Sequence, residues 1–190
     1  MQKQELRKEY LEKRKAHSDA EVESFSKKIH DWFFRSIPVH AYATIHTFLP
    51  IKRNHEIDTW LIINTLQKDF ATDIVIPKSH DDGTMSHYLL TKDTVFEENK
   101  WKIPEPSPVG SLQSSVKKID LVLIPLLYFD KKGYRVGYGK GYYDRFLAEC
   151  KPDVMKIGLS IFEPVDEITV DAFDVKMNYC ITPNKIWSFS

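Results

Sequence analysis

The sequence is poor in cysteine and lacks a long apolar run. It contains two cysteines, Cys150 and Cys180, whose wide separation gives neither a CxxC pair nor a disulfide framework. The longest apolar run, LVLIPLLYF, is too short to span a bilayer. The stretch MQKQELRKEY at the amino-terminal end is rich in charge, unlike a secretory signal. We therefore expect a cytoplasmic protein without a membrane partner.

The sequence also lacks an excess of either charge. Lys and Arg total 27, as do Asp and Glu, so the formal net charge is zero. A neutral chain exerts no overall attraction on nucleic acid, and we expect no such partner. An anionic small molecule must instead be held by a local cluster of cations. The 190 residues suffice for one domain with a sizeable core, and we expect residues 1–190 to form one monomeric domain.

Apolar segments alternate with amphipathic segments along the chain. Helices are predicted at residues 5–15, 19–34 (opened by the capping box SDAE), 57–67 and 142–150. Strands are predicted at residues 41–50, 72–77, 85–90, 119–127, 155–161 and 178–182, and an irregular loop at 103–111. Several strands are apolar throughout, which is typical of a sheet covered on both faces. The pattern predicts an α/β fold with a mainly parallel central sheet.

Glycine is scarce but concentrated in the stretch RVGYGKGYYDR, residues 135–145, which holds three of the seven glycines. Glycine is used where φ must be positive or where a ligand approaches the backbone. Alternating glycines before a helix let successive N–H groups form a concavity for phosphate, and Arg135, Lys140 and Arg145 add positive charge. The spacing matches neither a Walker A loop nor a dinucleotide fingerprint. A glycine-rich turn without a ligand remains the alternative.

Three cations share one side of the first predicted helix. At 100° per residue, Lys3, Arg7 and Arg14 fall within about 40° of one another. Apolar residues lie on the same side: Leu6, Tyr10 and Leu11. The cations could meet an anionic ligand there, or their long side chains could extend past the apolar edge into solvent. We expect Arg14, further along the helix, to matter less to such a ligand than Arg7.

Carboxylates provide the remaining candidate groups. Asp144 follows the glycine stretch and could hold a divalent cation or cap its helix. Asp174 could be a second cation ligand or a solvated loop residue. Glu56 follows a strand predicted to end at Pro50, where an α/β sheet presents its ligand crevice. The histidine spacing does not match a zinc motif, and neither cysteine has a neighbouring base.

Taken together, these segments resemble the 5-formyltetrahydrofolate cyclo-ligase family. GYRVGYGKGYYDRFL, preceded by DLVLIPLLYFD, is similar to the signature of that family. KQELRKEYLEKR resembles its basic helix, TFLPIKRNHEIDT its strand followed by Glu-x-x-Thr, KWKIPEP its tryptophan–proline loop, and NYCITP its closing strand. The matching segments occur in the same order over most of the chain.

The resemblance implies a three-layer α/β/α fold and a reaction that depends on ATP and Mg²⁺. In that reaction the formyl oxygen of 5-formyltetrahydrofolate is phosphorylated. N10 of the folate then attacks the activated carbon, and phosphate leaves to give 5,10-methenyltetrahydrofolate. Phosphoryl transfer requires positioning and charge neutralisation more than a protein nucleophile.

The resemblance also implies roles for individual residues. Those expected to bind ATP are Lys3, Arg7, Arg135, Val136, Gly137, Tyr138, Gly139, Lys140, Gly141, Tyr142 and Tyr143. Lys140 and Arg145 are the expected catalytic cations, and Asp144 and Asp174 the expected Mg²⁺ ligands. Those expected to bind the folate substrate are Leu49, Glu56, Trp101, Tyr138, Gly139, Lys140, Gly141 and Tyr142, with Trp101 against the flat pterin.

Two other functions fit part of the pattern. A non-catalytic α/β module that binds a phosphosugar or nucleotide would keep the glycine stretch without requiring Glu56 or Trp101. A distinct ATP-dependent kinase would share the nucleotide site but act on another heterocycle. Phosphate release assayed across candidate substrates separates these functions.

Overall fold

A seven-stranded sheet forms the centre of the molecule in the computed structural model, which describes residues 3–99 and 103–189. The strand order is β11–β10–β9–β6–β1–β2–β3. The five inner strands are parallel, and the outer strands β11 and β3 run antiparallel to their neighbours. The strands are β1 (Thr44–His46), β2 (Asp73–Ser79), β3 (Met85–Leu89), β6 (Leu121–Pro125), β9 (Met155–Leu159), β10 (Tyr179–Ile181) and β11 (Ile186–Ser188).

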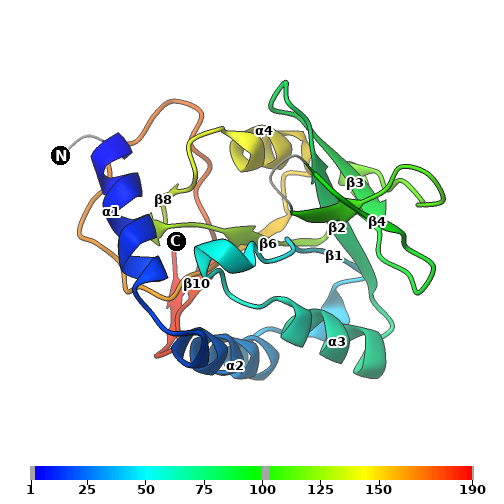
Figure 1. Cartoon of the computed structure of the whole chain (residues 1–190), viewed down its shortest axis with the longest axis horizontal. Coiled ribbons are helices and arrows are strands. Elements are labelled where there is room, and N and C mark those ends of the chain that lie inside the picture. The colour runs from blue at the N-terminus through cyan, green and yellow to red at the C-terminus, as the bar shows by residue number, and fades with distance from the viewer. Residues whose placement is uncertain (1–2, 100–102, 190) are drawn as a thin grey trace.

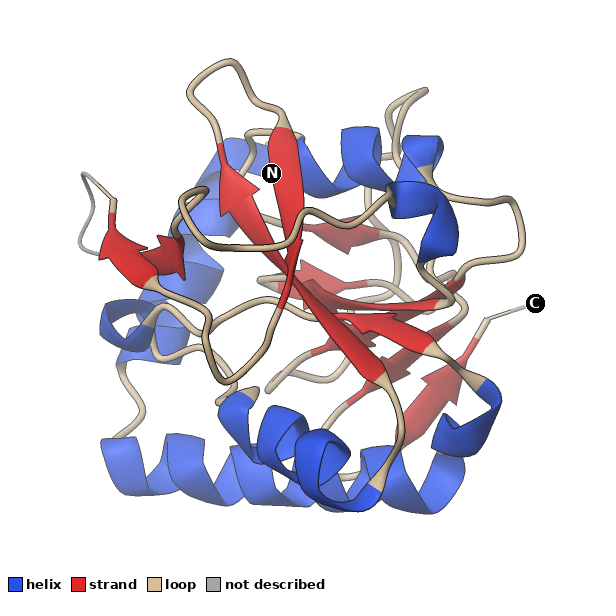
Figure 2. Cartoon of the chain, turned by 90° about the vertical axis from the view of Figure 1, so that its right-hand side faces the viewer, coloured by secondary structure: helices blue, strands red, loops and turns tan. Residues whose placement is uncertain are grey.

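Helices cover both faces of this sheet. Helices α2 (Asp19–Ser36) and α3 (Trp60–Asp69) lie along one face, α4 (Tyr142–Glu149) lies on the other, and α1 (Lys3–Lys15) stands beside one end (Figure 1). Figure 2 shows the same layers from the side, with helices below and above the strands. In the described part of the chain, no helix has both the length and the apolar character to cross a membrane. The fold is therefore the three-layer α/β/α arrangement that the sequence predicted.

The alternating side chains of the strands build two apolar layers. In β6, Leu121 and Leu123 enter the layer beneath α2 and α3, which also holds Phe33. The intervening residues Val122 and Ile124 enter the layer beneath α4. Because successive strand residues point to opposite faces, a strand buried on both sides must be apolar throughout. This explains why β6 was the clearest strand in the sequence.

Several predicted boundaries differ from the structure. The strand predicted at residues 41–50 is shorter, since residues 39–41 form the 3₁₀ turn η1 (Val39–Ala41) and β1 ends at His46. The loop predicted at residues 103–111 contains β5 (Pro104–Pro106), which pairs with β4 (Phe96–Glu98) in a separate arm. Proline is tolerated there because it lies at the ends of a short strand outside the main sheet. The hairpin of β7 (Tyr128–Phe129) and β8 (Arg135–Val136) was also missed.

The direction of the chain across the sheet reverses between β1 and β6. From β1 the chain continues outward to β2 and β3, whereas from β6 it continues the opposite way to β9, β10 and β11. Loops that leave the carboxyl ends of two such strands diverge, so a crevice opens between them. The 3₁₀ turn η2 (Lys52–Asn54) lies in the loop after β1, and η3 (Val116–Lys118) precedes β6. The fold thus places a ligand crevice where β1 and β6 end.

Candidate active site

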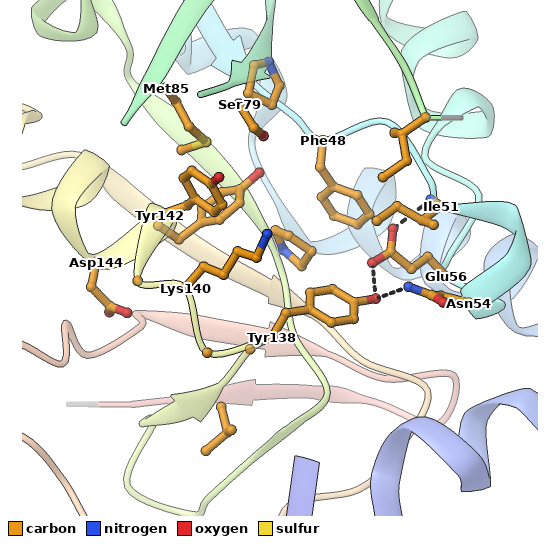
Figure 3. A pocket seen from close by; sticks show the side chains of 18 of the residues that line it. Phe48, Ile51, Asn54, Glu56, Ser79, Met85, Tyr138, Lys140, Tyr142 and Asp144 are labelled. Atoms are coloured by element: carbon orange, nitrogen blue, oxygen red, sulfur yellow. Dashed lines mark hydrogen bonds between the residues drawn. The ribbon is translucent and has the colours of Figure 1, made fainter. Parts of the chain in front are cut away.

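A cavity of about 480 Å³ lies at this crevice (Figure 3). It is lined by the start of α1, the loop after β1, the end of β2, the arm of β4 and β5, and the glycine loop, residues 137–141. Most of the residues predicted to bind a ligand line it: Lys3, Arg7, Leu49, Glu56, the run from Arg135 to Asp144, and Asp174. Trp101 lies outside the described residues. The chain therefore brings distant predicted segments together around one cavity.

The glycine loop joins β8 to the first turn of α4. Gly139 and Gly141 have φ values of +89° and +69°, in the region that favours glycine. A Cβ atom added to Gly139 would lie 3.0 Å from the guanidinium carbon of Arg7. Gly137 has no such φ, and among the described residues nothing lies within 4 Å of a Cβ built there. Positive φ and close approach thus combine at Gly139.

The cations at the start of α1 face this loop. The Nε of Arg7 donates a hydrogen bond to the carbonyl of Gly137 at 3.2 Å. The Nζ of Lys3 lies 2.6 Å from Asp171 and 2.9 Å from Asp174. Arg7 therefore crosses the glycine loop instead of extending into solvent, and the charge of Lys3 is balanced at the cavity wall.

Asp144 and Asp174 both line the cavity beside these cations. The Oδ1 of Asp144 accepts from buried Arg135 at 2.7 Å and from the backbone N–H of Val175 at 3.2 Å. Asp174 accepts from Lys3 through Oδ2, which also accepts from a backbone N–H. Within the described ranges, no group of three or more His, Cys, Asp or Glu side chains could hold a metal ion. Each predicted metal ligand is thus one carboxylate already paired with a cation.

Glu56 lies on the opposite wall and is 5% exposed. Its Oε2 accepts from the backbone N–H of Ile51 at 2.7 Å, and its Oε1 accepts from the hydroxyl of Tyr138 (Figure 3). Burial raises the pKa of Glu56, while the nearby guanidinium of Arg14 and the two hydrogen bonds act in the opposite direction. Hydrogen bonds hold both carboxyl oxygens in place, and burial makes the ionised carboxylate unfavourable.

The two predicted catalytic cations occupy different places. The side chain of Lys140 extends into the cavity beside Tyr138 and Tyr142 (Figure 3). Arg145 is absent from the described residues that line the cavity, and its guanidinium bonds the carbonyls of Gly83 at 2.7 Å and Lys140 at 2.6 Å. Arg145 thereby ties the turn between β2 and β3 to the glycine loop. Its catalytic role stays a prediction.

The burial of two charged groups near the cavity was not predicted from the sequence. Arg14, expected to matter less to an anionic ligand than Arg7, is 4% exposed and bonds the hydroxyl of Tyr138. A helical projection places Arg14 near the apolar stripe but does not reveal its depth. Glu105 is also buried at the cavity wall, where it accepts from the backbone N–H of Ser79 at 3.1 Å. The proline-rich segment around it gave no signal for this position.

Comparison with known proteins gives a consistent result. The model of the 5-formyltetrahydrofolate cyclo-ligase family matches residues 1–183. The chain is 31% identical to the 5-formyltetrahydrofolate cyclo-ligase of Mycoplasma pneumoniae over 186 residues, covering 95% of this chain and 98% of the relative. The solved structure of Aquifex aeolicus 5,10-methenyltetrahydrofolate synthetase is similar, with a TM-score of 0.81, 26% identity, and coverage of 99% of this chain and 93% of that one. A 5,10-methenyltetrahydrofolate synthetase structure from Mycoplasma pneumoniae gives a TM-score of 0.74 at 27% identity, covering 95% and 98%.

Proposed function

The chain belongs to the 5-formyltetrahydrofolate cyclo-ligase family, and from this premise we propose that it uses ATP to convert 5-formyltetrahydrofolate into 5,10-methenyltetrahydrofolate. The formyl oxygen attacks the γ-phosphorus, and ADP leaves. N10 then attacks the activated formyl carbon, the C–O bond to phosphate breaks, and the N10 proton leaves with the phosphate. The new ring retains the carbon between N5 and N10.

The observation that carries the proposal is that two chemically different walls face one cavity. On one wall, the loop at Gly139 lies against Arg7, an arrangement suited to phosphate oxygens. On the other wall, buried Glu56 can accept hydrogen bonds from ring N–H groups of a pterin. A two-substrate phosphoryl transfer needs both ligands held together, because positioning and charge stabilisation supply most of its catalysis.

The cations are suited to the charge that develops during transfer. Lys140 extends into the cavity, and Arg7 lies across the glycine loop. Fixed positive groups in a partly enclosed site stabilise phosphoryl oxygens more strongly than they would in water. The two thiols take no part in this scheme, since Cys150 and Cys180 are buried in the layer beneath α4.

Asp144 and Asp174 are the residues that would hold Mg²⁺, which would supply further charge neutralisation for the nucleotide phosphates. Mg²⁺ is commonly bound by one or two carboxylates together with substrate phosphates, not by an all-protein cage. Two carboxylates on the cavity wall fit that pattern. Arg135 pairs with Asp144, and Lys3 pairs with Asp174.

The test is the growth of methenyl-folate absorbance from 5-formyltetrahydrofolate in the presence and absence of ATP. We expect product only with ATP, accompanied by equimolar phosphate. Glu56→Gln should raise the folate KM about tenfold, worth roughly 1.4 kcal/mol, with ATP affinity near the parent value. ATP binding without turnover would instead indicate a nucleotide-binding module. Phosphate release with a different heterocycle alone would indicate another kinase.

A further inference from the structure

Arg14 is a deeply buried cation that takes no part in the proposed reaction steps. It lies at the carboxyl-terminal end of α1, whose other end carries the nucleotide-facing residues Lys3 and Arg7. Its Nε donates to the carbonyl of Asn54 at 2.7 Å, and its Nη1 donates to the carbonyl of Leu126 at 3.2 Å. One guanidinium thus connects α1 to the loops after β1 and β6.

The remaining donor of Arg14 reaches the glycine loop. Its Nη2 donates to the hydroxyl oxygen of Tyr138, and the side-chain amide of Asn54 donates to the same oxygen at 3.3 Å. A tyrosine hydroxyl has one proton to donate and room to accept two hydrogen bonds. Since Arg14 and Asn54 occupy the accepting positions, the proton of Tyr138 is directed toward Glu56, whose Oε1 accepts it.

The charge of Arg14 also acts on Glu56 directly. Its Nη2 lies 3.9 Å from the Oε1 of Glu56, and both side chains are at most 5% exposed. At such burial the attraction between a guanidinium and a carboxylate is weakly screened by solvent. Arg14 therefore influences both the direction and the charge of the group that faces the pterin in the proposed function.

We propose that Arg14 is a positioning residue for the folate substrate, because its hydrogen bond to Tyr138 directs the tyrosine hydroxyl onto Glu56 and so fixes that carboxylate. The inference rests on the proposed function. Arg14 touches neither nucleotide nor folate in this scheme and acts through Tyr138 and through its charge on Glu56. A lysine at this position keeps the charge but cannot span three acceptors as a guanidinium fork does.

The experiment compares the KM values for 5-formyltetrahydrofolate and for ATP in Arg14→Gln, Arg14→Lys and Tyr138→Phe. We expect Arg14→Gln to raise the folate KM about tenfold and to leave the ATP KM within about twofold. Arg14→Lys should give an intermediate folate KM. The matched control is Lys15→Gln, which removes one exposed charge from the same turn and should behave as the parent.

Combining Arg14→Gln with Tyr138→Phe tests the route of the effect. Because part of the effect of Arg14 passes through the tyrosine hydroxyl, the loss in the double variant should be smaller than the sum of the two single losses. Additive losses would overturn the proposal. Equal losses of ATP and folate binding would also overturn it, since they would mean that Arg14 only anchors α1. If Arg14→Gln fails to fold, the same cycle is measured with Arg14→Lys.

The pH profile of kcat/KM for the folate gives a second measurement. Glu56 faces Arg14 from α1, Tyr138 from the glycine loop and Tyr143 from α4. Without the guanidinium, the pKa of Glu56 should rise further, and the acidic limb should move to higher pH. A profile in which kcat/KM changes in magnitude while the acidic limb stays at the same pH would contradict the proposal. Parent protein that never turns over 5-formyltetrahydrofolate would refute the proposed function, whereas an active parent with an unchanged Arg14→Gln folate KM refutes this inference alone.

Discussion

At the residue scale, Gly139 is the position where backbone conformation and ligand access meet. Its φ of +89° is resisted by any β-branched residue, and a Cβ there would press on Arg7. We expect Gly139→Val to abolish binding of a non-hydrolysable ATP analogue, measured by calorimetry, with the fold retained. Gly110→Val is the control, because Gly110 has a similar φ of +82° and a Cβ there meets nothing among the described residues. Equal loss of nucleotide binding in both variants would contradict the assignment of Gly139 to the nucleotide site.

His46 and His87 form a second feature at this scale. Their rings lie 4.6 Å and 4.3 Å from the ring of Phe146, in the layer between the sheet and α4. Among the described residues, neither nitrogen of His46 nor the Nδ1 of His87 has a hydrogen-bond partner. Burial lowers the pKa of both, that of His87 to about 4, and the neighbouring His87 lowers the pKa of His46 further. Burial therefore favours the neutral form of both imidazoles in the folded protein.

This pair predicts a loss of stability in mild acid. Because the folded pKa lies below the unfolded value near 6.5, the unfolded state binds more protons as pH falls. The free energy of unfolding should fall by about 1.4 kcal/mol per pH unit between pH 6.5 and about 4 through His87, and His46 should make the fall steeper. Urea denaturation at several pH values measures the slope. His46→Leu and His87→Leu should each flatten it, and an unchanged slope in both would contradict the prediction.

At the scale of elements, α1 carries much of the charge that the cavity presents. Arg7 contacts the glycine loop, whereas Lys8, the next residue, is exposed. We expect Arg7→Ala to raise the ATP KM about tenfold or more and to change stability little, since a helix surface cation contributes only ~0.5 kcal/mol. Lys8→Ala should match the parent in both respects. ATP kinetics unchanged by Arg7→Ala would mean that the cation plays no part in nucleotide binding.

The elements predicted from the sequence are those that lie in a long amphipathic segment or a continuous apolar run. β6 was found because both of its faces are covered, and α2 because its capping box forms, with Ser18 and Glu21 bonded to each other. β7, β8 and β11 each span two or three residues, too few for any periodicity, whereas the equally short β1 and β10 were predicted from the longer stretches that contain them. The pairing partners of β7, β8 and β11, not their own residues, decide their conformation, so a local pattern could not find them.

The candidate site was predicted where it depends on local geometry. The glycine spacing indicated positive φ, and the structure has it at Gly139 and Gly141. The helical projection placed Arg7 on the correct side of α1. The burial of Arg14 was not predicted, because it depends on the carbonyl of Leu126, a residue 112 positions away in the chain. Contacts between residues so far apart in the chain produce no local sequence pattern.

At the scale of the whole molecule, the cavity joins α1, both halves of the sheet and the arm of β4 and β5. A ligand bound there should therefore stabilise the global fold. At one hundred times its Kd, a ligand adds about 2.7 kcal/mol, equivalent to roughly 5–11 °C in Tm for a chain of this size. We expect an ATP analogue and 5-formyltetrahydrofolate each to raise the Tm in thermal scans.

The variants described above provide the controls for this measurement. Gly139→Val should lose the shift caused by the nucleotide. Glu56→Gln should weaken only the folate shift. Loss of both shifts in Glu56→Gln would indicate that the two ligands do not occupy separate walls of the cavity.

The position of β1 beside β6 has a consequence for how the chain acquires its cavity. β1 pairs early in the chain with β2, but the N–H of Thr44 donates to Asp120, 76 residues further on. Contacts of such separation form slowly, since a long loop must close before they are gained. The crevice lies at this junction, and its glycine loop comes later still in synthesis. A nascent chain in which β6 and the glycine loop have not yet been synthesised cannot bind the nucleotide, even when β1 and β2 have already paired.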